Sequence, residues 1–82
     1  MDKNDLLADV QEIFRDVFDE DELQIHFATN AKDIEEWDSL AQIRLTVAIE
    51  KRYNIKFAFG ELQNLNNVGE MLDVILEKIA AR

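Results

Sequence analysis

Apolar residues recur at helical spacing in the first part of the chain. Over residues 5–18 they occupy positions i, i+3, i+4 and i+7, and charged residues fill the positions between them. This pattern predicts an amphipathic helix with one buried face. Either Asp2 or Asn4 can cap its first turn. The apolar positions are Leu6, Leu7, Val10, Ile13, Phe14, Val17 and Phe18.

Residues 39–53 predict a second helix that is apolar on two sides. Ser39 and Gln42 have the spacing of a capping box, which predicts that the Ser39 side chain caps the start of this helix. Such a helix either lies at the centre of the bundle or leaves one stripe for a partner. At about 100° per residue, one stripe contains Ala41, Leu45, Ala48, Ile49 and Tyr53, and the nearly opposite stripe contains Leu40, Ile43 and Val47.

The C-terminal part predicts one more long helix with a short one before it. Asn67 can cap a helix whose apolar residues stay in phase over residues 68–79, and residues 60–65 suffice for one or two helical turns. The chain has two glycines and no proline, which also favours helices. We therefore expect an all-α fold in one domain, residues 1–82: a small four-helix bundle with three longer helices, a short third helix and a long loop between helices one and two.

The long connection, residues 19–38, lacks helical rhythm. A connection of this length in a small domain is either functional or contains an undetected element. Residues 23–27 (LQIHF) and 55–59 (IKFAF) both alternate like strands, so a two-stranded ribbon is the alternative to an all-helical fold. Apolar residues that can anchor the connection to the core are Leu23, Ile25, Phe27, Ile34 and Trp37.

Charge and composition exclude several classes of function. Nine Lys and Arg residues against eighteen Asp and Glu residues give a net charge of −9, which repels nucleic acids and anionic membrane surfaces. Basic protein surfaces are the natural complement of such a chain. The chain has no cysteine, and no stretch approaches the ~20 apolar residues that cross a bilayer. We expect a cytoplasmic monomer without an export signal or membrane insertion.

The residues for common catalytic or metal sites are missing. The only histidine is His26, so no paired histidine site can form, and we expect it to be a partly covered surface residue. Residues 19–22 (DEDE) begin like a calcium loop, but Gln24 stands where glycine is needed and Asn30 where a bidentate Glu is needed. We therefore expect neither a metal site nor an enzyme.

Ser39 stands where the long loop meets the second helix. Asp38 and Trp37 precede it and Leu40 follows it. A phosphate ester at this position would face unpaired backbone N–H groups and the positive end of the helix dipole. Cap serines are common, so the spacing alone favours a structural role over an attachment site.

The stretch WDSLAQIRLTVAIEKRYNIKF, residues 37–57, strongly resembles the modification site and second helix of acyl carrier proteins. The stretch GELQNLNNVGEMLDVIL, residues 60–76, is similar to the third and fourth helices of that family, and the first amphipathic run is similar to its first helix. The resemblance covers nearly the whole chain. A D-S-L triplet alone is a weak motif, but its position before a phased helix in an acidic chain of this length is fairly specific.

This resemblance implies that Ser39 receives 4'-phosphopantetheine from coenzyme A through a phosphopantetheinyl transferase, and that the arm then carries acyl groups as thioesters. It further implies that Asp38 helps to place the serine for the transferase and its Mg²⁺, and that Leu40 makes the apolar contact after the modified residue. Because the chain has no cysteine, the arm would supply its only thiol.

The resemblance also implies a docking surface, an acyl pocket and a class of partners. Unlike the acidic second helix of housekeeping carriers, this helix contains Arg44, Lys51 and Arg52. We therefore expect a stand-alone, specialised carrier that serves acyl-activating and acyl-transferring or condensing enzymes of a dedicated lipid, polyketide, nonribosomal or polysaccharide-modifying pathway. The expected docking residues are Leu40, Ile43, Arg44, Val47, Glu50 and Lys51. The expected pocket residues are Gln42, Thr46, Ala48, Phe57 and Leu65, of which the polar Gln42 and Thr46 favour a shallow or short-chain pocket.

The alternative is an acidic helical adaptor without a prosthetic group. In that reading Ser39 only caps the second helix, and the stripe that contains Leu40 grips a partner helix. The alternative predicts that Ser39→Ala costs about 1 kcal/mol of stability and leaves partner binding intact.

Overall fold

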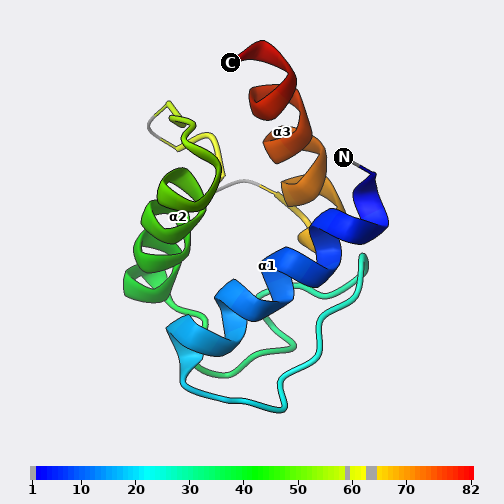
Figure 1. The fold of residues 1–82 in the computed structure, drawn as a ribbon. Helices are drawn as coiled ribbons and strands as arrows, with labels where there is room; N and C mark the ends of the chain where they lie inside the picture. Colours follow the sequence, from blue (N-terminus) through cyan, green and yellow to red (C-terminus); the bar gives the residue numbers. More distant parts are fainter. Residues whose placement is uncertain (1, 59, 63–64) are drawn as a thin grey trace.

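The computed structural model describes residues 2–58, 60–62 and 65–82 (Figure 1). Its regular elements are three α-helices, α1 (Lys3–Phe18), α2 (Ser39–Tyr53) and α3 (Val68–Ala81). These ranges contain no β-strand, so the expectation of an all-helical fold is confirmed. None of the described helices is long and apolar enough to cross a bilayer.

Helix α1 packs against both α2 and α3 and runs diagonally across them (Figure 1). Of the two candidate caps, Asp2 fills the role: its Oδ1 accepts the backbone N–H groups of Asn4 at 2.6 Å and Asp5 at 3.3 Å. The helix ends at Phe18, because Asp19 adopts the left-handed conformation with a φ of 53°. The side chains that it buries are Leu6, Val10, Ile13 and Phe14.

All three helices and both long connections contribute to one hydrophobic core. Helix α3 buries Val68, Met71, Leu72 and Ile75 and partly buries Leu76 and Ile79. Asn67 caps it by accepting the Glu70 N–H at 2.9 Å. Burial of apolar surface is the main favourable term in folding, so this shared core fixes the helices relative to one another. The fully buried side chains are Leu6, Val10, Phe14, Leu45, Ile49, Val68, Met71, Leu72 and Ile75.

The connection between α1 and α2 is a loop that buried side chains hold against the core, and not a strand. Its Ile25 and Ile34 are buried, whereas Phe27 is 39% exposed and lies beneath the Lys3 ammonium. The N–H of Ile25 donates to Gln11 Oε1 at 3.0 Å, so a side chain of α1 satisfies a group that a strand partner would satisfy. The predicted ribbon is absent from the described residues, and Phe59 of its second segment lies outside them.

The same loop also holds the start of α3. The backbone N–H groups of Val68 and Gly69 donate to the carbonyl oxygens of Thr29 and Phe27, at 2.7 and 2.8 Å. A Cβ at position 69 would lie 3.1 Å from that Phe27 oxygen, so glycine permits this close approach.

The predicted short helix over residues 60–65 falls partly on residues 63 and 64, which lie outside the described ranges. Residues 60–62 form a turn, in which the Glu61 N–H donates to the Ala58 carbonyl oxygen at 3.0 Å and Gly60 adopts a φ of 80°. Glycine adopts this left-handed conformation without a steric penalty. The four-helix count is therefore not established by the described residues.

Candidate functional site

Asp38, and not Ser39, caps helix α2. Its backbone is extended, with φ −106° and ψ −171°, and its Oδ1 accepts the Ala41 N–H at 2.9 Å. The predicted capping box is therefore wrong, because Ser39 is the first helical residue and the Gln42 side chain bonds elsewhere. Asp and Ser are about equally good caps, and the observed register uses the aspartate.

This register leaves the Ser39 side chain exposed at the N-terminus of α2. No hydrogen bond among the described residues uses its hydroxyl or the backbone N–H groups of Ser39 and Leu40. Ser39 is also the only serine in the chain. Free N–H groups and the positive end of the helix dipole stabilise a negative charge, so a phosphate ester on this hydroxyl fits its surroundings.

Trp37 and Gln42 fix the loop that leads to Ser39. The Trp37 Nε1–H donates to Gln42 Oε1 at 2.7 Å, and Gln42 Nε2 donates to the Leu62 carbonyl oxygen at 3.1 Å. The Trp37 ring also meets the Phe14 ring edge to face, with centroids 5.2 Å apart. The loop is therefore held by these contacts two residues before Ser39, whose own side chain is exposed.

Helix α2 separates its two apolar stripes cleanly. Leu45 and Ile49 are completely buried, whereas Leu40, Ile43 and Val47 are 56%, 58% and 42% exposed. The second stripe therefore lies free on the surface, beside the serine. The segment that follows α2 borders Ile43 and Val47 across a groove and leaves both side chains exposed.

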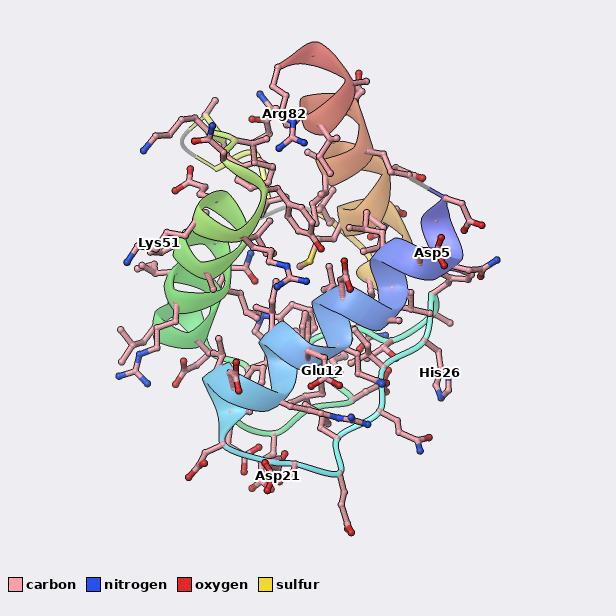
Figure 2. All side chains as sticks on the ribbon, in the orientation of Figure 1. Asp5, Glu12, Asp21, His26, Lys51 and Arg82 are labelled. Carbon is pink, nitrogen blue, oxygen red and sulfur yellow. The ribbon has the colours of Figure 1, made fainter. Side chains whose placement is uncertain are left out.

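The charged residues of α2 give this exposed face a positive sign. Arg44 and Lys51 are exposed, and Figure 2 shows Lys51 projecting away from α1 and α3. Glu50 is half buried because its carboxylate accepts the Phe57 N–H at 2.9 Å, so it turns toward the following segment. Arg52 lies 3.7 Å from Asp9 across the contact with α1.

A groove of about 200 Å³ lies between α2 and the segment that follows it. Of the predicted pocket residues, Gln42, Thr46 and Phe57 line this groove, whereas Leu65 lines a separate inner cavity of about 70 Å³. Ala48 lines neither hollow and packs against the core. Six further residues line the groove, of which Ile43 and Val47 were predicted only as docking residues and the other four were not predicted: Ile43, Val47, Ala58, Gly60, Glu61 and Leu62.

Glu61 ties one wall of the groove to α3. Its Oε1 accepts the Ala58 N–H at 2.8 Å and lies 3.0 Å from Lys78 Nζ. The hydrogen bond from the Ala58 amide, together with Lys78, lowers the pKa of Glu61 below its usual range. At the C-terminal end of α2, burial raises the pKa of Tyr53, and the nearby Asp9 carboxylate raises it further.

His26 and the acidic run lie on the loop between α1 and α2. Figure 2 shows Asp21 and His26 on this loop. His26 is exposed, and the part of the chain that the structure describes has no group of three His, Asp or Glu side chains that could hold a metal ion.

Two comparisons with known proteins identify the family. The family model described as "Phosphopantetheine attachment site" matches residues 8–75. The solution NMR structure of the holo acyl carrier protein from Geobacter metallireducens is 47% identical and has a TM-score of 0.83, with 92% of this chain and 86% of that chain covered. The chain belongs to the acyl carrier protein family. As a carrier of this family the chain is non-catalytic, and its matched region is a phosphopantetheine attachment domain. Comparison with curated proteins gives no match.

Proposed function

We propose that Ser39 is the attachment point of the 4'-phosphopantetheine arm and that the protein presents acyl thioesters on this arm to partner enzymes. One observation supports the proposal above all others: the only serine of a chain in the phosphopantetheine attachment family is exposed at the first position of α2. The adaptor alternative loses its basis, because it needs Ser39 as the cap and Asp38 has that role.

We propose that Asp38 and Leu40 help the phosphopantetheinyl transferase to engage the serine. The cap bond uses Asp38 Oδ1, so Oδ2 stays available to the transferase and its Mg²⁺. Leu40 is more than half exposed next to the hydroxyl and offers an apolar contact to the same enzyme.

The exposed face of α2 is the proposed docking surface for later partners. These are acyl-activating and acyl-transferring or condensing enzymes of a dedicated lipid, polyketide, nonribosomal or polysaccharide-modifying pathway. Its apolar stripe and the cations Arg44 and Lys51 favour partners with an acidic rim around an apolar site. Glu50 contributes less, since its carboxylate is engaged by the Phe57 amide.

The proposal also includes the general setting of the carrier. It acts as a cytoplasmic monomer in a single domain, and residues 60–65 form the short third helix of a four-helix bundle. A right-handed helix can begin here only after Gly60, whose φ of 80° is left-handed. Backbone chemical shifts of residues 60–65 test it directly.

Mass spectrometry tests the attachment site. Incubation with a broad-range phosphopantetheinyl transferase, Mg²⁺ and coenzyme A should add the mass of one arm to the wild type and nothing to Ser39→Ala. Thr46→Ala removes another hydroxyl of α2. This variant should still be modified once, because the Thr46 hydroxyl is engaged with the Gln42 carbonyl oxygen at 2.8 Å and is not the proposed attachment site. An unmodified wild type, under conditions that convert a control carrier, would contradict the proposal.

A further inference from the structure

Two hollows meet at one side chain near the start of α2. The outer groove of about 200 Å³ adjoins the smaller, inner cavity of about 70 Å³, whose lining includes the exposed Ala31 and Asn66. Gln42 and Leu62 line both hollows. Gln42 lies three residues after Ser39, about 5 Å along the helix axis, so a group tethered to Ser39 reaches this boundary easily.

The Gln42 side chain is held across this boundary by both ends of its amide. Its Oε1 accepts from Trp37 Nε1 at 2.7 Å, and its Nε2 donates to the Leu62 carbonyl oxygen at 3.1 Å. The two partners belong to the segments before and after α2. The edge-to-face contact with Phe14 holds the Trp37 ring in turn, so the amide cannot move without breaking both hydrogen bonds.

We propose that Gln42 is a gate that confines the acyl cargo to the outer groove and thereby makes short acyl chains the preferred cargo. This inference rests on the proposed function, in which the arm on Ser39 carries the acyl group. The outer groove has apolar walls from Ile43, Val47 and Phe57. Its volume is below the roughly 300–1,000 Å³ of pockets for drug-sized ligands, which suits a short chain.

A longer acyl chain gains little free energy by displacing Gln42 and entering the inner cavity. Entry would leave the partly buried Trp37 N–H and Leu62 carbonyl oxygen unpaired against the acyl chain, and polar groups that lose water without gaining a partner carry a desolvation cost. Three asparagines, Asn30, Asn66 and Asn67, also line the inner cavity, whose volume is that of a few water molecules. The intact gate therefore leaves the end of a long chain in solvent.

The test compares butyryl and dodecanoyl groups. The transferase loads each one as an acyl-4'-phosphopantetheine arm from its acyl-coenzyme A, with release of 3',5'-ADP. Two quantities are measured against the unacylated holo form of the same variant: the melting temperature and the emission of Trp37, the only tryptophan in the chain. In the wild type, dodecanoyl should raise the melting temperature no more than butyryl does, and neither should shift the emission. In Gln42→Ala, dodecanoyl should add several degrees and move the emission to shorter wavelength.

Gln11→Ala is the matched control. This substitution removes a glutamine side chain and its hydrogen bond from the Ile25 N–H. Gln11 lines neither hollow. The variant should respond to both acyl groups as the wild type does. If Gln42→Ala does not fold, Gln42→Leu supplies the same test, because it keeps the bulk of the gate and removes both of its hydrogen bonds.

Two results would overturn the gate. The first is a wild type in which dodecanoyl already adds stability and shifts Trp37. The second is a Gln42 variant that is folded, fully loaded and indistinguishable from the wild type. The absence of any loading, seen in the mass spectrum, would instead refute the attachment site, so the two proposals fail in different ways.

Discussion

At the scale of single residues, two adjacent side chains at the start of α2 have different roles. Asp38 satisfies a backbone amide of the first turn, and Ser39 is left with an exposed hydroxyl. If the serine were the cap, modification of its oxygen would remove a hydrogen bond that stabilises the helix. With aspartate as the cap, attachment of a group to Ser39 leaves that bond intact.

We predict that Asp38→Ala lowers the free energy of unfolding by about 1 kcal/mol, because the Ala41 N–H loses its acceptor. Asp38→Asn should lose only part of this, since asparagine also caps helices. Ser39→Ala should be close to wild type. Urea unfolding followed by circular dichroism measures all three. A loss in Ser39→Ala as large as that in Asp38→Ala would restore the serine as the cap.

The sequence predicted the helices better than the details at their ends. The apolar phase of each helix depends on its own residues, so the buried positions of α1, α2 and α3 could be read directly. The hydrogen-bond partners of Gln42 could not be predicted from the sequence, because Trp37 and Leu62 come close to it only after the chain has folded. The alternation in residues 23–27 likewise reflects a loop that turns Ile25 toward the core, and not a strand.

At the scale of elements, α2 is the helix with two separate tasks. Its buried stripe joins it to α1, and its exposed stripe is free for other molecules. The two stripes therefore respond to different measurements. Substitutions in one should change stability, and substitutions in the other should change recognition.

We predict that Leu45→Ala lowers the free energy of unfolding by roughly 2–5 kcal/mol, because it removes a completely buried side chain and leaves a cavity. Ile43→Ala should change it by no more than about 0.5 kcal/mol, because that side chain is mostly exposed. Chemical denaturation of both variants checks this contrast. A large loss in Ile43→Ala would show that the second stripe is covered in solution.

The segment after α2 depends on Glu61, whose folded-state pKa is lowered. The stabilisation from this carboxylate is present above its ordinary pKa of 4.5 and is lost as the pH falls below that value. We predict that Glu61→Gln is less stable than the wild type at neutral pH, and that the difference shrinks on acidification below 4.5. Urea unfolding at a series of pH values measures it. A difference that does not change with pH would assign the effect to packing.

At the scale of the whole molecule, negative charge exceeds what the fold can pair. The net charge is −9, and the described residues form four ion pairs, of which Lys3–Asp73 and Lys78–Glu61 reach α3. Many acidic side chains remain exposed, among them Glu20, Asp21 and Glu22. Their mutual repulsion opposes the folded state.

We predict that added sodium chloride raises the melting temperature, and that magnesium chloride does so at lower concentration. Screening weakens repulsion between exposed charges, and a divalent cation screens more effectively at equal concentration. Calorimetry over a salt series measures the shift. A melting temperature independent of salt would mean that the acidic groups are already balanced in the fold.

The start of α3 restricts how this chain can change length. Two of its amides rely on carbonyl oxygens at positions 27 and 29, so one residue inserted or deleted between those positions would misalign both bonds. Residues 20–22 are exposed and precede this register. Epitope tags or fluorescent labels therefore belong at residues 20–22, and natural variation in loop length should concentrate there as well.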